Sequence, residues 1–191
     1  TDRPVTVKCR IGIDDMDPET GLDRFVDAVA DAGAQVIYLH ARKAWLNGLS
    51  PKENREIPPL DYGRAERLAR RRPDLDIILN GGLTDRDMTS AMLQPVGQIF
   101  AGVMLGRAAY KTPYQLGLFH QILHNKTAPI DLVDIALKMT DYAEQQIKTG
   151  VPLQAITRHM LGLCAGLKGA RVFRREPVSY THLTLPTMIG V

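Results

Sequence analysis

Polar side chains and glycines follow four short apolar runs of the sequence, at the points where strands of a parallel sheet would end. Lys8 and Arg10 close the first run, and His40 follows the second. Asn80-Gly81-Gly82 and Gly106-Arg107 follow the third and the fourth. Glycines let backbone N–H groups approach a ligand, and arginine adds a bidentate contact to an anion. These strand ends predict a site for a phosphorylated ligand; tight turns without a ligand are the alternative.

Lys8 and His40 are the candidates for contacting the reactive part of that ligand. A lysine is seldom buried without a partner, and a cation at the mouth of the sheet can stabilise negative charge on a bound ligand. A water-facing lysine on an edge strand and a structural histidine are the alternatives. Cys9 alternates with Lys8, so we expect it to point away into packing. It is a poor candidate for a catalytic thiol, and so is Cys164.

The elements that must position these residues alternate between strand and helix. Short β-rich apolar runs predict the strands, and apolar residues at helical spacing predict the helices. Such alternation favours parallel βαβ units, whose ligand sites form at the carboxyl ends of the strands, as in (β/α)8 barrels. We expect strands at 5–11, 36–39, 77–79 and 103–105, and helices at 22–32, 62–71 and 84–93.

The pattern changes after Tyr114, where strand signals stop. Helical spacing predicts helices over 131–147 and 152–163. We therefore divide the chain into an α/β domain, residues 1–126, and an all-α domain, residues 127–177. Residues 178–191 carry no charge and differ in character from what precedes them. We interpret them as a non-native tail, with a genuine divergent C-terminus as the alternative.

Composition sets weaker limits. The chain has 24 Lys and Arg against 21 Asp and Glu, a net charge of +3, which hints at an anionic partner. Its two cysteines fit a reducing compartment, and no apolar run approaches the length of a membrane span. The chain lacks an initiator Met and enters a strand almost at once, so we interpret it as a fragment cut inside a fold. We expect a cytoplasmic monomer with neither a membrane nor a metal partner.

Basic residues gather in three places. One is the long segment after His40, with Arg42, Lys52 and Arg55; Trp45 or Tyr62 in it can stack on an exposed base. The arginine run of residues 64–72 is interpreted as a solvated helix face rather than an RNA contact. The third group favours RNA, since phosphate contacts give affinity without reading sequence, and comprises Arg158, His159, Lys168, Arg171, Arg174 and Arg175.

Five motifs now support a family resemblance. They are V-K-C-R-I-G-I-D-D from Val7, H-A-R-K-A-W-L-N-G-L-S-P-K-E-N-R-E-I-P-P-L-D-Y from His40, N-G-G, G-R-A-A-Y and R-H-M-L-G-L. Over Val5 to Arg175 the chain resembles the tRNA-dihydrouridine synthases, in particular their A-type branch. The second motif is long enough to be highly specific.

The resemblance implies an FMN-binding (β/α)8 barrel followed by a helical tRNA-binding domain. Residues 1–126 would be the C-terminal half of the barrel, and 127–177 a truncated helical domain. NADPH would reduce the flavin, which would reduce a D-loop uridine of the U20/U20a type to 5,6-dihydrouridine. The implied flavin contacts are Lys8, His40, Asn80, Gly81, Gly82, Gly106 and Arg107. The implied tRNA contacts are Arg10, Arg42, Lys52, Arg55, Arg158, Arg171, Arg174 and Arg175.

Two departures qualify the resemblance. The family's proton-donating cysteine would lie on a loop upstream of Thr1, so we expect no catalytic residue in this fragment and no activity from it alone. Residues 93–102 also form a longer connection than the family's usual one.

Two other functions compete with a tRNA reductase. Another FMN-dependent barrel acting on a small molecule, such as a dihydroorotate-dehydrogenase-like enzyme, explains the strand ends but not the basic segment or the appended helices. An RNA-binding module without chemistry explains the charge but gives the glycine motifs no purpose.

Overall fold

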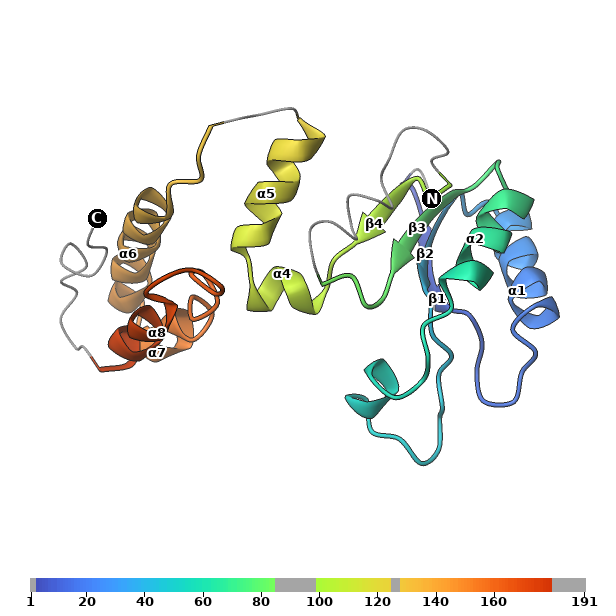
Figure 1. The fold of residues 1–191 in the computed structure, drawn as a ribbon, viewed down its shortest axis with the longest axis horizontal. Coiled ribbons are helices and arrows are strands. Elements are labelled where there is room, and N and C mark those ends of the chain that lie inside the picture. The colour runs from blue at the N-terminus through green and yellow to red at the C-terminus, as the bar shows by residue number, and fades with distance from the viewer. Residues whose placement is uncertain (1–2, 85–98, 125–127, 180–191) are drawn as a thin grey trace. The chain divides into compact units, whose positions relative to one another are not determined.

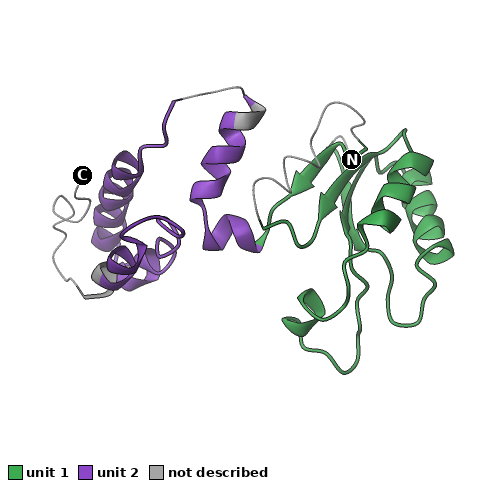
Figure 2. Ribbon diagram, in the orientation of Figure 1, with its two compact units in different colours: residues 1–106 green, residues 107–191 purple. Residues whose placement is uncertain are grey.

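The protein folds into two compact units, residues 1–106 and residues 107–191 (Figure 2). The computed structural model describes residues 3–84, 99–124 and 128–179. By chain contacts the division falls at Gly106, so the first two helices after the sheet belong to the second unit. The predicted domain boundary after residue 126 stays a prediction.

A parallel sheet of four strands forms the first unit, as the alternation predicts. The strands are β1 (Thr6–Arg10), β2 (Val36–His40), β3 (Asp76–Asn80) and β4 (Gly102–Met104), hydrogen-bonded in the order of the chain. Their register aligns Arg10 with His40, His40 with Asn80, and Asn80 with Met104. The carboxyl ends of the four strands therefore meet in one row.

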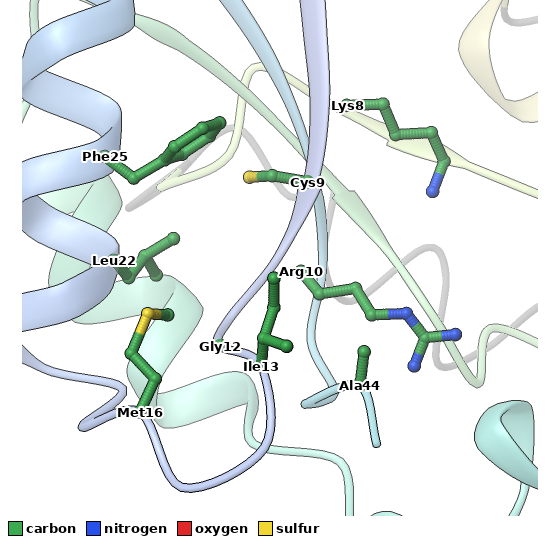
Figure 3. A pocket seen from close by; sticks show the side chains of 9 residues that line it. All are labelled: Lys8, Cys9, Arg10, Gly12, Ile13, Met16, Leu22, Phe25 and Ala44. Atoms are coloured by element: carbon green, nitrogen blue, oxygen red, sulfur yellow. The ribbon is translucent and has the colours of Figure 1, made fainter. Parts of the chain in front are cut away.

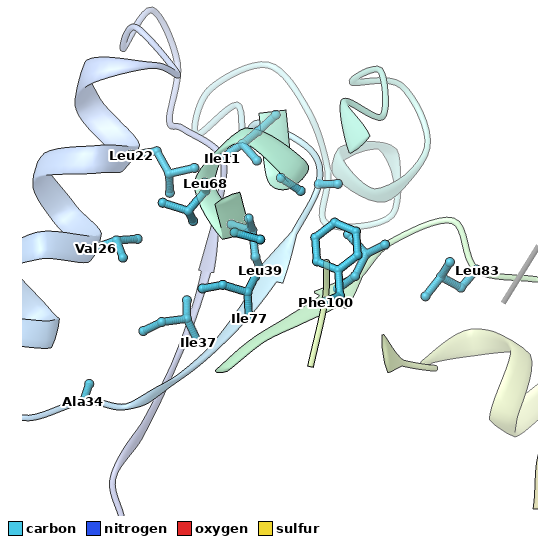
Figure 4. Close-up of a cluster of buried hydrophobic side chains, with 14 residues drawn as sticks. Ile11, Leu22, Val26, Ala34, Ile37, Leu39, Leu68, Ile77, Leu83 and Phe100 are labelled. Carbon is cyan, nitrogen blue, oxygen red and sulfur yellow. The ribbon is translucent and has the colours of Figure 1, made fainter. Parts of the chain in front are cut away.

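Helices cover one face of this sheet (Figure 1). They are α1 (Thr20–Asp31) and α2 (Tyr62–Arg71). The alternating positions Ile37, Leu39, Ile77 and Leu79 point toward them and are 0–1% exposed. The helices contribute partners to this core, shown in Figure 4, that include Leu22, Val26, Ala65 and Leu68. Alternation sends the next residue of each strand to the opposite face, where Lys8 is exposed and Tyr38, His40, Ile78 and Asn80 are only half-buried.

The helix ends follow from local chemistry. Asp61 precedes α2, and its carboxylate accepts a hydrogen bond from the Arg64 N–H at 2.8 Å. This is the N-cap arrangement that satisfies free backbone donors at a helix start. Asp17 accepts hydrogen bonds from the N–H groups of Glu19 and Thr20 at the start of α1, at 3.2 and 3.0 Å. These bonds lower the pKa of the Asp17 carboxyl, led by the Thr20 hydroxyl contact.

The arginine run of α2 is only in part the solvated face that its sequence predicts, since Arg67 and Arg70 are exposed and Arg64 is buried. Arg64 is 1% exposed and donates hydrogen bonds to the carbonyl oxygens of Pro18 and Glu19 at 2.8 and 3.0 Å. It also pairs with Asp23 at 2.5 Å. Arginines farther along the helix pair with other acidic residues of α1: Arg67 with Glu19, and Arg71 and Arg72 with Asp27. The run therefore fastens α2 to α1.

Helices make up the described part of the second unit. They are α4 (Arg107–Lys111), α5 (Tyr114–Leu123), α6 (Leu132–Lys148), α7 (Leu153–Thr157) and α8 (Ala170–Ser179). Helix α6 confirms the predicted helix over 131–147, with Asp131 capping it through the N–H groups of Val133 and Asp134, both at 2.9 Å. The predicted helix over 84–93 lies outside the described residues except for Thr84.

The predicted helix over 152–163 is wrong in length. α7 ends at Thr157 and continues as turns, in which the Leu163 N–H donates to the Met160 carbonyl oxygen at 2.8 Å. Gly162 lies against another chain segment, since a Cβ there would come 2.4 Å from the Lys111 carbonyl oxygen. This close backbone approach admits only glycine and accompanies the departure from a regular helix.

In the described part of the chain no helix combines the length and the apolar character needed to cross a membrane.

Candidate functional site

The carboxyl ends of the strands bring His40 and the two glycines after β3 together. Gly81 and Gly82 have φ angles of 107° and 68°, a conformation that favours glycine. A Cβ on Gly81 would lie 2.6 Å from Cδ2 of His40, so the imidazole lies directly over this glycine. The sequence prediction that His40 shares a site with Gly81 and Gly82 is therefore consistent with their arrangement, although no ligand tests it.

Two residues that were not predicted as contacts shape the same turn. The Tyr62 hydroxyl donates a hydrogen bond to the Gly81 carbonyl oxygen at 2.7 Å. A Cβ on Gly82 would lie 2.3 Å from Cδ1 of Leu60. Tyr62 was predicted only as a residue that can stack on a base. No local signal in the sequence pairs it with Gly81, because the contact is made across the fold.

Asn80 uses its side chain to join two strand ends. Its amide nitrogen donates to the Met104 carbonyl oxygen at 2.8 Å, which ties β3 to β4. A role in holding a phosphate stays a prediction for Asn80. Gly106 closes the first unit and Arg107 opens the second, at the exposed start of α4. The predicted grouping of Arg107 with Gly81 and Gly82 likewise stays a prediction.

Lys8 and Cys9 lie on opposite faces of β1. Figure 3 shows the side chains of Lys8 and Arg10 directed away from that of Cys9, which points toward Phe25 of α1. Burial raises the pKa of the Cys9 thiol to about 11, against a smaller lowering by Lys8. A thiol with this pKa is almost entirely protonated at neutral pH, and the thiolate is the nucleophile. These features support the interpretation of Cys9 as a packing residue.

An apolar cavity of about 510 Å³ lies beside Cys9 (Figure 3). Its wall on the helix side comes from Leu22 and Phe25, with Met16 at one end. Cys9 and these neighbours supply no anion-binding group, but Lys8 and Arg10 of the strand-end row also line the cavity.

The long segment after β2 is an ordered loop, as its composition predicts. The Ala41 N–H donates to the Asn80 carbonyl oxygen at 2.9 Å, and the Asp61 N–H donates to the Ala41 carbonyl oxygen at 2.8 Å. These bonds close the two ends of the loop at the edge of the sheet. Residues 41–61 are called the basic loop below.

Two predicted tRNA contacts hold the basic loop from inside. Arg10 donates through Nη1 to the carbonyl oxygens of Lys43 and Asn54, both at 2.8 Å. Arg42 donates to the carbonyl oxygens of Glu56, at 3.3 Å, and Pro58. Burial, followed by the charges of Arg42 and Arg55, lowers the pKa of Arg10. Both arginines therefore bind loop backbone in this structure, and a tRNA contact by either stays a prediction.

Lys52 and Arg55 lie at the outer part of the basic loop. Both are exposed. Lys52 directly precedes the short 3-10 helix η1 (Glu53–Arg55), and Arg55 is the last residue of that helix. Ser50 and Glu53 cap this turn reciprocally: the Ser50 N–H donates to the Glu53 carboxylate at 2.8 Å, and the Glu53 N–H to the Ser50 hydroxyl at 3.3 Å. The arrangement presents two cations on a braced turn.

A second basic group lies in the second unit. His159 lies between Tyr110, whose hydroxyl is 2.9 Å from Nδ1, and Arg158, whose Nε donates to Nε2 at 3.1 Å. Arg171, Arg174 and Arg175 are exposed on α8. Among the residues that the structure describes, no three His, Cys, Asp or Glu side chains gather as a metal site would require.

The comparisons with known proteins agree on one family. A family model described as dihydrouridine synthase (Dus) matches residues 1–185, including the first residues of the predicted non-native tail. A protein of Pasteurella multocida named tRNA-dihydrouridine(20/20a) synthase is 50% identical over 94% of this chain and 54% of its own length. Proteins with the same name from Shewanella oneidensis and Haemophilus ducreyi are 47% and 48% identical, over 95% and 92% of this chain and 53% of their own lengths. The chain thus spans about half the length of the curated relatives it matches.

Proposed function

Because the chain belongs to the dihydrouridine synthase family, we propose that it is the C-terminal half of a flavin-dependent tRNA-dihydrouridine synthase of the U20/U20a type. The name of its relatives supports the substrate, and the half-length coverage supports the fragment. In this proposal the four-stranded sheet is the second half of a (β/α)8 barrel, and the helices after it belong to a tRNA-binding domain. The longer protein that contains this sequence is called the full-length synthase below.

The observation that carries the proposal is the chemistry of the row at the strand ends. One face of the sheet is covered by α1 and α2, whereas the other offers Lys8, Tyr38, His40 and Ile78, which are exposed or half-buried. A barrel interior needs such a second face. The row also combines cations with two glycines in the left-handed region, a set suited to an anionic, planar cofactor.

The residues present fit FMN. Gly81 and Gly82 leave no room for a Cβ because the side chains of His40 and Leu60 pack against them, so this turn holds His40 at the strand ends. Tyr62 fixes that backbone through its 2.7 Å bond to the Gly81 carbonyl oxygen. His40 would then hydrogen-bond the cofactor, and Gly106 and Arg107 would complete the phosphate contacts with Asn80. When bound, FMN would supply the two-electron reduction of a uridine C5–C6 bond, with NADPH as the reductant.

The side chains of this half would bind and orient rather than donate the catalytic proton. Lys8 would place a positive charge beside the cofactor ring and favour its negatively charged state. Cys9 is not placed to be the proton donor, because its side chain points toward Phe25 of α1 and away from Lys8. In line with the family resemblance, we assign the proton-donating cysteine to a part of the full-length synthase outside this chain, so the chain would be inactive by itself.

The tRNA would be held from two places, the basic loop and the exposed arginines of the helical unit. Lys52 and Arg55 are the loop residues proposed to contact phosphate, because both are exposed at η1. Arg158, Arg171, Arg174 and Arg175 would contact tRNA from the second unit. A tRNA substrate agrees with the predicted cytoplasmic location; the monomeric state stays a prediction.

The experiment that tests the function is a product assay with the full-length synthase. Purified enzyme is incubated with NADPH and unmodified tRNA, and the tRNA is digested and analysed by mass spectrometry. We expect one D-loop uridine to gain two hydrogen atoms. A small-molecule oxidoreductase would instead oxidise NADPH without changing the tRNA, and an RNA-binding module would be purified without flavin absorbance.

Replacing Lys52 and Arg55 together with alanine should weaken tRNA binding in a salt-dependent way. Each lost phosphate contact changes the log–log slope of affinity against salt by about 0.7 for single strands. The double variant should therefore flatten the slope by about one to two contacts. Flavin content and NADPH oxidation should stay at wild-type values, since neither needs RNA.

The matched control is the double variant Arg67→Ala and Arg70→Ala. These arginines are also exposed, but they pair with Glu19 and Glu66 on the helices. Their loss should leave the salt slope unchanged. An unchanged slope in the Lys52 and Arg55 variant would remove these two residues from the tRNA interface.

A further inference from the structure

Asn54 makes an unusual set of contacts inside the basic loop. Its amide nitrogen donates to the Trp45 carbonyl oxygen at 2.7 Å, and its amide oxygen accepts from the Trp45 N–H at 2.8 Å. The same nitrogen lies 3.3 Å from the Leu49 carbonyl oxygen, a third acceptor. The side chain thus imitates a neighbouring strand and holds both backbone groups of Trp45.

The backbone of Asn54 is itself anchored to the sheet. Its carbonyl oxygen accepts a hydrogen bond at 2.8 Å from Arg10, which stands at the end of β1. A chain of contacts therefore runs from the strand end through Asn54 to Trp45. Arg10, predicted as a tRNA contact, supports this chain of contacts.

The residues on either side of Trp45 are held as well. The Ala44 N–H donates to the Gly12 carbonyl oxygen at 2.9 Å, and Leu46 donates through its N–H to the Asp14 carboxylate at 2.8 Å. Trp45 is 37% exposed and Leu46 is 68% exposed. The fold therefore fixes the backbone here while part of the Trp45 surface stays open to solvent.

The surroundings of the indole suit a nucleobase. Lys43 places its ammonium group 5.6 Å from the centroid of the Trp45 ring, within the range of a cation–π contact. Lys52 adds an exposed cation to the same loop. Exposed aromatic rings beside cations are the surfaces on which proteins stack unpaired RNA bases, while the cations contact the adjoining phosphates.

We propose that Asn54 is a positioning residue that holds Trp45 as a stacking platform for an unpaired base of the RNA substrate. The inference rests on the proposed function, since it takes tRNA as the ligand, and it adds a residue and a contact to that function. Asn54 acts through Trp45 and does not touch the RNA. Its contribution is to order the indole before binding, so that the complex does not lose that freedom on association.

The first arm of the test needs no RNA. Hydrogen–deuterium exchange of the full-length synthase is followed by mass spectrometry in peptides of the basic loop. Asn54→Ala should speed exchange in the peptide containing Trp45, because the Trp45 N–H loses its acceptor. Asn47→Ala is the matched control, as Asn47 is an exposed asparagine of the same loop. Equal exchange in both variants would overturn the bracing role.

The second arm is a double-mutant cycle on the dissociation constant for an unmodified tRNA transcript. Trp45→Ala should weaken binding about 5- to 100-fold, the range of one base–aromatic stack. Asn54→Ala should weaken binding about three- to tenfold, which matches the ordering of one side chain. In the Trp45→Ala background, Asn54→Ala should add less than about twofold, because its effect passes through the indole.

The outcomes separate the inference from the proposed function. Full additivity of Asn54→Ala and Trp45→Ala would show that Asn54 acts elsewhere and would overturn the positioning role. Wild-type affinity in Trp45→Ala, with dihydrouridine still formed by the unmutated enzyme, would overturn the stacking platform but leave the function intact. Failure of the unmutated enzyme to bind or reduce any tRNA would overturn both the proposed function and the RNA role of Trp45.

Discussion

The full-length synthase with Gly81→Ala is expected to lose its flavin on purification. Gly81 has a φ of 107°, and a Cβ there would lie 2.6 Å from Cδ2 and 2.9 Å from Nε2 of His40. Distances below 3.0 Å force neighbouring atoms to shift, and Cδ2 of Leu60 would also lie only 3.2 Å from this Cβ. Displacing His40 removes a predicted hydrogen bond to the cofactor, which should raise the dissociation constant for FMN about 10- to 100-fold.

Gly33→Ala is the matched control for this substitution. Gly33 has a φ of 101°, close to that of Gly81, but nothing lies within 4 Å of a Cβ built on it. Both variants therefore carry similar backbone strain, and only Gly81→Ala disturbs His40. The measurement is flavin absorbance per protein after dialysis. Flavin retained equally by the two variants would show that the turn after β3 is not part of the cofactor site.

The second large effect concerns stability. Arg64→Leu should lower the free energy of unfolding by about 1.5–3 kcal/mol, the range for hydrogen bonds to a charged group, because Arg64 is buried while its partner Asp23 is 31% exposed. The guanidinium is 1% exposed, and it pairs with Asp23 and binds two backbone carbonyl oxygens. All three acceptors would lose their donor in the variant. Urea denaturation of the full-length synthase measures the loss.

Arg70→Leu provides the comparison on the same helix. Arg70 forms an exposed pair with Glu66 one turn away, and such pairs contribute about 0.3–0.5 kcal/mol. Arg70→Leu should therefore lower the free energy of unfolding several-fold less than Arg64→Leu does. Similar denaturation midpoints for the two variants would mean that the contacts of Arg64 do not hold α2 to α1 in solution.

Much of the first unit could be predicted from local sequence. The predicted helix over 62–71 coincides with α2, because Asp61 caps it and Pro73 follows it. The four strands lie within one or two residues of their predicted limits, because short apolar runs rich in β-branched residues are typical of buried strands. The alternation that turns Cys9 away from Lys8 also follows directly from strand geometry.

What the sequence could not supply were partners far along the chain. The acidic residues that neutralise the arginine run belong to α1, more than forty positions before Arg64 for Asp23. The early end of α7 accompanies contact between Gly162 and the backbone of Lys111, which no helical periodicity reveals. In the same way, Arg10 looked like a ligand contact because its type and strand-end position suit one. The loop that it braces became visible only in three dimensions.

The candidate site likewise contains some residues that could be predicted from the sequence and others that could not. His40, Gly81 and Gly82 could be placed together because the carboxyl ends of parallel strands meet at one edge of the sheet. Tyr62 and Leu60 could not, since they reach this edge from the end of the basic loop. No sequence pattern indicated a role for Asn54, because its side chain hydrogen-bonds the backbone of Trp45, nine positions away.

The most direct test asks whether the reduced flavin of the full-length synthase passes its electrons to a uridine of tRNA. The full-length synthase is reduced with NADPH without oxygen, freed of excess reductant and mixed with unmodified tRNA, and the return of the oxidised flavin absorbance is followed. The same tRNA already carrying dihydrouridine is the control. The account predicts rapid reoxidation by the unmodified tRNA alone. No reoxidation, or the same rate with both tRNAs, would contradict it.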